Sequence, residues 1–131
     1  MADGNTIKNK ILLIDDNVIY LSTAASYLAD EYEVFKATSG TEALGYLYDH
    51  EFTPDLIILD ILMPDMDGWE VFNRIRAIGI LKNVPIAFLT SVEGEREIVK
   101  ARELGAADYI IKPYNMADLR VRLKEILKGP K

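Results

Sequence analysis

The chain has 131 residues, half of them apolar, and a formal net charge of −6, which suits one folded domain with its own core. Because it has no cysteine and a single histidine, disulfides, a thiol nucleophile and a histidine-rich or thiolate metal site are excluded. It also lacks a membrane-spanning apolar stretch, a signal-peptide pattern and a dense basic run, so we expect a cytoplasmic protein that binds neither membranes nor nucleic acid directly.

Strands and helices are predicted to alternate along the chain, after a flexible tail over residues 1–9. Four short segments are apolar at consecutive positions, which is typical of strands buried on both faces. They cover residues 11–14, 56–59, 86–89 and 109–111, and a more polar strand over 33–37 suits the edge of a sheet. Apolar residues at helical spacing predict helices over 18–29, 41–48, 69–78, 98–104 and 119–127.

Local signals agree with these boundaries. Residues 39–42 have the sequence of a capping box, Asp67 can cap a helix that begins at Gly68, and Asn115 can cap the last helix. Right-handed crossovers between such strands predict an α/β fold, with a doubly wound parallel sheet and helices on both faces. The domain is expected to span residues 10–128, followed by a short tail over 129–131.

Polar residues stand where the four apolar strands end. They are Asp15 and Asp16, Asp60, Thr90 and Lys112, in chain order. In an open parallel sheet the ligand site lies at the carboxyl ends of the strands, so these side chains are expected to converge. Neighbouring carboxylates repel one another, and a hard divalent cation with oxygen ligands relieves that repulsion. The few carboxylates favour Mg²⁺, and the lysine can add a second positive charge.

Each of these residues also has a purely structural explanation when it is taken alone. Asp15 or Asp16 can cap the helix that follows, and Thr90 with Ser91 can cap a later one. The Lys112 side chain can extend from its strand to the surface. The coincidence of polar residues at four strand ends favours a shared site over these separate explanations.

The ordered set of motifs resembles the receiver domain of two-component response regulators, and the chemotaxis regulators in particular. The set consists of Asp15-Asp16, Asp60-Ile61-Leu62-Met63-Pro64 with Asp67-Gly68, Thr90-Ser91, and Tyr109 before Lys112-Pro113. The resemblance covers roughly residues 10–128. It implies a five-stranded sheet of flavodoxin-like order 2-1-3-4-5 with five helices, and a protein that catalyses only its own phosphorylation and dephosphorylation.

The resemblance also implies roles for the acidic residues. Asp60 would accept a phosphoryl group from a partner histidine kinase or phosphotransfer protein. Mg²⁺ would be bound directly by Asp16, by Asp60 and by the backbone carbonyl of Leu62, and by Asp15 through a water. Phosphoryl transfer depends mainly on positioning and charge neutralisation, so a metal, a lysine and a hydroxyl around an in-line nucleophile are sufficient.

A switch is implied as well. In receivers the hydroxyl at Thr90 moves toward the phosphate, and the aromatic ring at Tyr109 swings into the vacated space. The face of the fourth helix, fifth strand and fifth helix would then meet a downstream protein, or a second copy of the chain in a homodimer. One hydrogen bond to a charged group supplies about 1.5–3 kcal/mol, whereas a full switch takes about 5.5 kcal/mol. Lys112, the amides near Ser91 and the metal must therefore contribute. Tyr109 can alternatively serve only to pack on a helix.

Two apolar residues predict a long-lived phosphate. Leu62 and Val92 lie two residues after Asp60 and Thr90, at positions that in receivers lie over the phosphate. Neither side chain can orient a hydrolytic water, so we expect slow loss of the label. Trp69, which opens the helix after this loop, is expected to pack rather than to react.

Other classes of protein remain as alternatives. A haloacid-dehalogenase-type phosphatase carries Asp-x-Asp at its nucleophile, but here the second position is Leu62. A flavodoxin-like electron carrier holds its cofactor phosphate in a Ser/Thr/Gly-rich loop after the first strand. This chain has Asp15-Asp16-Asn17 at that place, and the two carboxylates would repel a phosphate. Within the receiver family, the chain can be a phosphorelay intermediate or a module of a longer regulator or hybrid kinase. Gly129-Pro130 ends the last helix and favours a stand-alone receiver.

Overall fold

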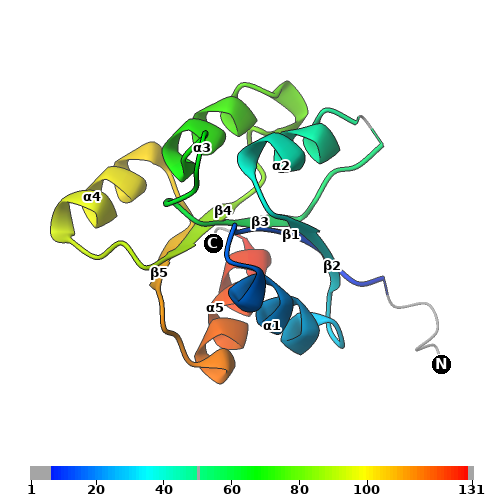
Figure 1. Cartoon of the computed structure of the whole chain (residues 1–131). Coiled ribbons are helices and arrows are strands. Elements are labelled where there is room, and N and C mark those ends of the chain that lie inside the picture. Colours follow the sequence, from blue (N-terminus) through cyan, green and yellow to red (C-terminus); the bar gives the residue numbers. More distant parts are fainter. Residues whose placement is uncertain (1–6, 50, 130–131) are drawn as a thin grey trace.

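A computed structural model describes residues 7–49 and 51–129. The expected alternation of strands and helices is confirmed (Figure 1). The elements are β1 (Lys10–Ile14), α1 (Val18–Leu28), β2 (Glu33–Ala37), α2 (Gly40–Leu47), β3 (Leu56–Leu59), α3 (Gly68–Arg76), the 3₁₀ turn η2 (Gly79–Leu81), β4 (Ile86–Thr90), α4 (Glu95–Leu104), β5 (Asp108–Ile111) and α5 (Met116–Lys128).

The five strands form one parallel sheet in the order β2-β1-β3-β4-β5, as predicted. The polar strand β2 lies at an edge. Helices α1 and α5 cover one face of the sheet, and α2, α3 and α4 cover the other (Figure 1). Ile14 at the end of β1 is in register with Leu59 at the end of β3. The residues that follow these two strands are therefore neighbours in space.

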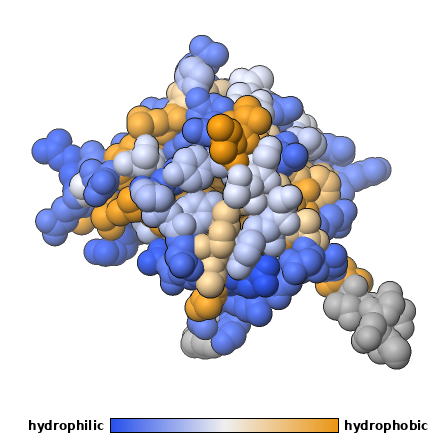
Figure 2. All heavy atoms as spheres, turned by 60° about the horizontal axis from the view of Figure 1, so that its bottom comes forward, coloured by the Kyte–Doolittle hydropathy of each residue, from blue (hydrophilic) through white to orange (hydrophobic). Residues whose placement is uncertain are grey.

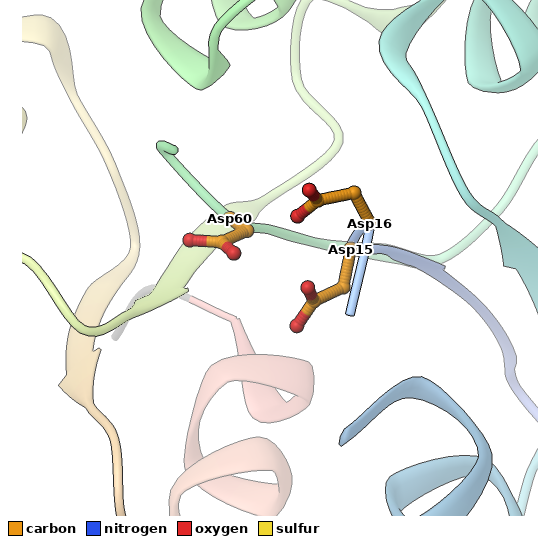
Figure 3. Close-up of side chains that lie close together, drawn as sticks. All are labelled: Asp15, Asp16 and Asp60. Carbon is orange, nitrogen blue, oxygen red and sulfur yellow. The ribbon is translucent and has the colours of Figure 1, made fainter. Parts of the chain in front are cut away.

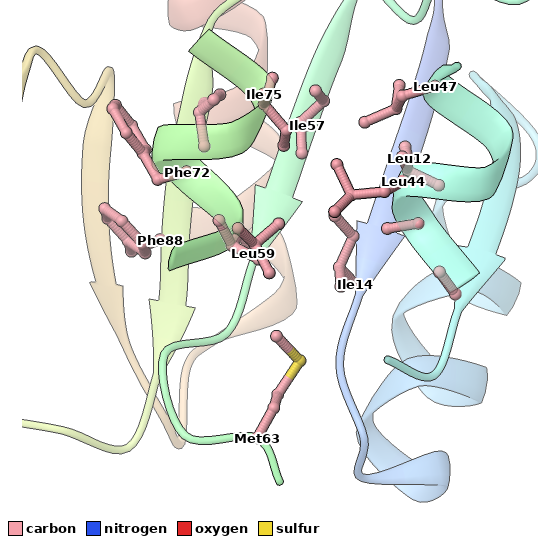
Figure 4. Packing of buried hydrophobic residues seen from close by; sticks show 14 of the residues in the cluster. Leu12, Ile14, Leu44, Leu47, Ile57, Leu59, Met63, Phe72, Ile75 and Phe88 are labelled. Carbon is pink, nitrogen blue, oxygen red and sulfur yellow. The ribbon is translucent and has the colours of Figure 1, made fainter. Parts of the chain in front are cut away.

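Two cores explain why the strands are apolar at consecutive positions. Leu12 and Ile14 of β1 face the cluster beneath α2, α3 and α4, part of which Figure 4 shows. Ile11 and Leu13 face the cluster formed with α1 and α5. Full burial of one such side chain stabilises the fold by about 1.5–3 kcal/mol, so neither face of the central strands tolerates polar residues.

Asn17 caps α1, and this settles one alternative left open by the sequence. Its side-chain oxygen accepts hydrogen bonds from the backbone N–H groups of Ile19 and Tyr20, at 3.0 and 3.1 Å. Neither Asp15 nor Asp16 caps the helix. Both carboxylates are therefore left for other contacts.

Three other helices have the N-cap residues that the sequence predicts, with one change of hydrogen-bond partner. Asp67 caps α3 and Asn115 caps α5. Ser39 accepts from the N–H of Glu42 at 3.0 Å, as a capping box requires. The Glu42 carboxylate, however, accepts from the N–H of Thr38 at 2.6 Å instead of from Ser39.

The start of α4 differs from the prediction. The helix begins at Glu95, three residues before the predicted Ile98, and its N-cap is Gly94 without a side-chain cap. Thr90 and Ser91 therefore do not cap it. The first turn was missed because it is acidic rather than apolar, a composition that the helix dipole favours at an N-terminus.

The remaining differences concern helix ends. α5 begins at Met116, three residues early, and α3 ends at Arg76, before the turn η2. The Arg76 guanidinium donates to the carbonyls of Leu81 and Val84, at 3.2 and 2.9 Å, and so fixes the chain after the helix. The other predicted helix ends agree within one residue.

The predicted tails fall mostly outside the described residues, which exclude 1–6 and 130–131. Asn9 accepts a backbone hydrogen bond from Glu33 at 2.9 Å, so the chain is already paired with β2 just before β1. Within the described part of the chain, no helix combines the length and the apolar character that crossing a bilayer requires. On the face shown in Figure 2, apolar residues lie in small patches among polar ones.

Candidate functional site

Sheet hydrogen bonds continue past the strand ends and fix the backbone of the site. The N–H groups of Asp15, Asp60 and Lys112 each donate to a carbonyl of a neighbouring strand, at 3.1, 3.0 and 2.9 Å. These residues lie outside the strands in sequence but remain part of the sheet. Their side chains therefore start from rigid positions at one edge.

The three aspartates form a cluster at this edge, as predicted. One carboxylate oxygen from each of Asp15, Asp16 and Asp60 lies within 4.8 Å of the others. Figure 3 shows the first two projecting to different sides of the end of β1, with Asp60 at the end of β3. Asp15 and Asp60 are buried, whereas Asp16 is exposed. At an effective dielectric near 20, two unit charges at this distance repel by about 3.5 kcal/mol.

Lys112 contributes a cation to the cluster. Its ammonium lies 2.6 Å from Asp15 Oδ2 and 3.3 Å from Asp60 Oδ2. The side chain is buried and so does not extend to the surface, which excludes the structural alternative for this residue. Burial acts to lower the pKa of the Lys112 ammonium, but the hydrogen bond to Asp15 and the charge of Asp60 outweigh it and raise that pKa.

Opposing effects act on the pKa of the Asp15 carboxyl, and the hydrogen bond from Lys112 offsets only part of the rise. Burial raises the pKa of Asp15 above the ordinary value, and the charge of Asp60 adds to the rise. Hydrogen bonds from Lys112 and from the backbone N–H of Asn17, which lies 2.8 Å from Asp15 Oδ1, act in the opposite direction. The effects of burial and of the charge of Asp60 on the pKa of Asp15 therefore outweigh those of the two hydrogen bonds.

A close approach of the backbone holds the loop after Asp60. Gly68, the first residue of α3, donates to the carbonyl of Ile61 at 2.8 Å. A Cβ atom at position 68 would lie 2.3 Å from the backbone oxygen of Asp60 and 2.7 Å from the Cα of Ile61. Glycine is therefore required there, because any side chain would push α3 away from the site.

Thr90 and Tyr109 meet through the loop that follows β4. Thr90 is fully buried, and its hydroxyl accepts from the N–H of Val92 at 3.2 Å. The Tyr109 hydroxyl donates to the carbonyl of the same Val92 at 2.7 Å. Its ring packs on Phe88, and burial raises the pKa of its phenol. The sequence placed Thr90 at this edge, and the resemblance gave Tyr109 a role in the switch, but neither predicted that both residues contact Val92.

The two apolar residues near the cluster and the tryptophan can also be placed. Leu62 is 58% exposed, and its N–H lies 3.4 Å from Asp60 Oδ1. Val92 is half-buried. Trp69 packs on Phe88, with ring centroids 4.9 Å apart, so the prediction of a packing role is confirmed.

The donor set fits a hard divalent cation. The cluster offers carboxylate oxygens, the ligands that Mg²⁺ and Ca²⁺ prefer. Asp16 is exposed, which leaves the cluster open to solvent on its side. The cluster has an excess of negative charge, because the Lys112 ammonium contacts only two of the three carboxylates, and a cation would neutralise this excess.

Sequence reasoning missed one aromatic neighbour of this site. The ring of Tyr20, in the first turn of α1, lies with its centroid 4.3 Å from the Lys112 ammonium. Tyr114 in turn packs against Tyr20. The sequence contained a signal for the contact between Tyr20 and Lys112, because the first turn of the predicted helix over 18–29 comes only one residue after the two aspartates.

A comparison with known families identifies this architecture. The family model of the response regulator receiver domain matches residues 11–124. The chain therefore belongs to the receiver domains of response regulators. An acidic pocket in such a domain implies signalling that is controlled by phosphorylation, and members of this family are generally not enzymes acting on other substrates.

Curated relatives agree with this assignment. The chain is 36% identical over 124 residues to the probable transcriptional regulator ycf27 of Guillardia theta, covering 92% of this chain and 46% of that protein. It is 34% identical over 125 residues to the probable transcriptional regulatory protein SilR of Salmonella typhimurium, covering 91% and 51%. The chain thus spans about half the length of the curated relatives it matches.

Solved structures of receivers are similar to this chain over most of its length. The chemotaxis protein CheY4 of Vibrio cholerae has a TM-score of 0.84 and 30% identity, covering 92% of this chain and 99% of that one. The receiver domain of a signal transduction histidine kinase from Syntrophus aciditrophicus has a TM-score of 0.82 and 31% identity, covering 94% and 92%. The similarity therefore includes receivers from different kinds of signalling proteins.

Proposed function

We propose that this receiver is a phosphorylation-controlled switch whose phosphoacceptor is Asp60. The observation that carries the proposal is the position of this carboxylate. It is buried at the end of β3, 3.3 Å from the Lys112 ammonium, and it shares a cluster with Asp15 and Asp16. A buried nucleophile among groups that can neutralise charge is what phosphoryl transfer needs.

The transfer would take place between a phosphohistidine of a partner kinase, as donor, and Asp60, as acceptor. One carboxylate oxygen of Asp60 forms a new bond to phosphorus while the P–N bond of a phosphohistidine on the kinase breaks. The histidine nitrogen keeps the electron pair of that bond. Lys112 then donates to a phosphoryl oxygen. Asp16, Asp60 and the backbone carbonyl of Leu62 would hold Mg²⁺ directly, and Asp15 would hold it through a water. Mg²⁺, when bound, would neutralise the charge that these oxygens and the phosphoryl group share.

Output would pass from Thr90 to Tyr109. Both side chains are hydrogen-bonded to Val92, so a movement of the threonine hydroxyl toward a phosphoryl group changes the loop that the tyrosine hydroxyl also contacts. The consequence would appear on the face of α4, β5 and α5. We propose that this face meets a protein partner or a second copy of the chain.

Partners follow from the same chemistry. Receiver domains work with histidine kinases, and a phosphotransfer protein is the equivalent donor in a phosphorelay. The relatives ycf27 and SilR carry the names of probable transcriptional regulators and are about twice as long, so control of transcription through a further module is a second candidate function. Action as a stand-alone receiver, a cytoplasmic location and a long-lived phosphate beneath Leu62 and Val92 remain predictions.

The direct test uses acetyl phosphate as donor and intact-mass spectrometry as readout. In the presence of Mg²⁺, the protein is expected to gain the mass of one phosphoryl group. Chelation with EDTA is expected to prevent the gain, because the acidic cluster then lacks its cation. A generic phosphomonoester should not be turned over. No mass gain from acetyl phosphate, and no response to beryllofluoride by NMR, would refute the proposed function.

Thr90→Ala is expected to separate labelling from response. The variant keeps the carboxylates and Lys112, so acetyl phosphate should still label it. Beryllofluoride is expected to shift the amide resonances of α4 and β5 in the wild-type protein but not in this variant, because the hydroxyl that links the site to Val92 is gone. Thr23→Ala, an exposed threonine on α1, is the matched control. Wild-type shifts in Thr90→Ala would contradict this route.

A further inference from the structure

Tyr20 contacts the buried lysine of the site through its aromatic face. The Lys112 ammonium lies 4.3 Å from the ring centroid, 2.6 Å from Asp15 Oδ2 and 3.3 Å from Asp60 Oδ2. An ammonium has three N–H donors, and in the described part of the chain these three groups surround it. Two of them are carboxylates that the proposed function assigns to metal binding and phosphorylation. The aromatic ring is the neighbour that takes no part in either.

Packing keeps the Tyr20 ring in place. Tyr114 follows Lys112 and Pro113 in the chain, and its ring centroid lies 6.2 Å from that of Tyr20 with planes tilted by 30°. Tyr114 packs against the core formed with α1 and α5. Its buried hydroxyl has no hydrogen-bond partner among residues 7–49 and 51–129. Tyr114 thus supports the Tyr20 ring mainly by its apolar surface.

An aromatic neighbour suits this position better than an acid. A ring face attracts a cation through its quadrupole, without adding a further negative charge to three carboxylates that already repel one another. It also offers no oxygen ligand at its face to compete for a metal ion. The ammonium can therefore exchange a carboxylate contact for a phosphoryl contact while its third neighbour stays unchanged.

We propose that Tyr20 is a positioning residue that holds the Lys112 ammonium at the mouth of the site by a cation–π contact. This proposal rests on the proposed function of Asp60 as phosphoacceptor. Tyr20 itself would not touch the phosphoryl group. Its ring, rather than its hydroxyl, carries the effect, so phenylalanine should replace it and an aliphatic residue should not.

Two measurements on the full chain test the proposal. The first is the rate constant of labelling by acetyl phosphate at saturating Mg²⁺. The second is the rate at which acetic anhydride acylates Lys112 in the metal-free protein, followed by peptide mass spectrometry. Tyr20→Leu is expected to label about fivefold more slowly, the factor expected for one partly desolvated cation–π contact, and to acylate faster at Lys112. Tyr20→Phe is expected to match the wild type in both measurements.

A matched control lies on the same helix. Tyr27, about two turns further along α1, carries the Arg120 guanidinium 4.5 Å from its ring centroid. This guanidinium pairs with Asp30 and Glu31 rather than with the aspartates of the site. Tyr27→Leu therefore removes a cation–π contact of α1 without touching the site, and both rates should stay at wild-type values. If Tyr20→Leu does not fold, Tyr20→Met supplies an unbranched side chain of similar reach and the same expectations.

The outcomes separate this proposal from the proposed function. Wild-type rates in Tyr20→Leu, or equal losses in Tyr20→Phe and Tyr20→Leu, would overturn the cation–π role. If the wild-type protein is not labelled at all, the phosphoacceptor proposal fails. The acylation rate of Lys112 still decides whether Tyr20 holds the ammonium in that case, because it requires neither metal nor phosphate.

Discussion

Asp60→Asn is expected to abolish labelling by acetyl phosphate. The amide that replaces the carboxylate has no negatively charged oxygen with which to attack phosphorus, although it keeps the size and shape of the side chain. The cluster also loses one of its three acids, so the apparent affinity for Mg²⁺ should fall. Intact-mass spectrometry of the variant beside the wild-type protein, with Mg²⁺ and equal donor, measures the first effect directly.

Asp65→Asn is the matched control for this change. Asp65 is an exposed residue of the loop after β3 and has a left-handed backbone, with φ at 70°. Asparagine tolerates that conformation as well as aspartate does. The control should label at the wild-type rate. Full labelling of Asp60→Asn would show that the phosphoryl group is carried elsewhere, and a loss of labelling in both variants would indicate damage to the loop.

Lys112→Met is expected to weaken both the metal-free fold and the response to phosphate. Without the ammonium, the buried carboxylates of Asp15 and Asp60 lose the cation that contacts both of them. Removing one partner of a buried ion pair typically costs about 3 kcal/mol or more. Urea unfolding without metal should show this loss, and Mg²⁺ should reverse part of it.

The difference in free energy of unfolding between Lys112→Met and the wild-type protein should decrease as the pH falls below neutral. The pKa of Lys112 is raised in the folded state, so its contribution is fully present below the ordinary value of 10.5 and is lost as pH rises through the folded value. The pKa of Asp15 is raised above its ordinary 3.8, so folding favours its protonated form as pH falls. The deficit of Lys112→Met should therefore be largest near neutral pH and shrink toward pH 4.

Binding of beryllofluoride gives a second measure of the same variant. A hydrogen bond to a charged group is worth about 1.5–3 kcal/mol, so Lys112→Met should bind this phosphoryl analogue about tenfold to hundredfold more weakly. Trp69 fluorescence can follow the titration. Lys82→Met, an exposed lysine beside η2, is the control and should bind like the wild type. Equal stability and equal binding in Lys112→Met would show that the ammonium is not part of the site.

The fold could be predicted from the sequence because burial on both faces marked the apolar strands and residue spacing marked the helices. Burial on both faces requires apolar residues at consecutive positions, and residues 11–14 of β1 and all of β3 are apolar and buried. The connecting helices could be predicted from the helical spacing of their apolar residues and from N-cap residues such as Asp67. Where a helix began with charged residues, as α4 does at Glu95, spacing alone was insufficient and the start was misplaced.

The convergence of the acids was also predictable, because parallel strands that end at one edge bring their next residues together. That rule placed Asp15, Asp16 and Asp60 in one cluster with no knowledge of side-chain directions. It could not say which aspartate would be buried. It also could not choose between a cap and a ligand, a choice that Asn17 decided by taking the cap.

The sequence by itself determined the order of the strands' apolar runs, the edge where the polar residues gather, and the family. Only the tertiary structure decided the contacts made across elements. Tyr20 reaches Lys112, and Tyr109 reaches Val92, because packing of α1 and of the loop after β4 brings together side chains far apart in the chain. Such contacts depend on distances and directions in three dimensions, which residue order along one strand or helix does not fix.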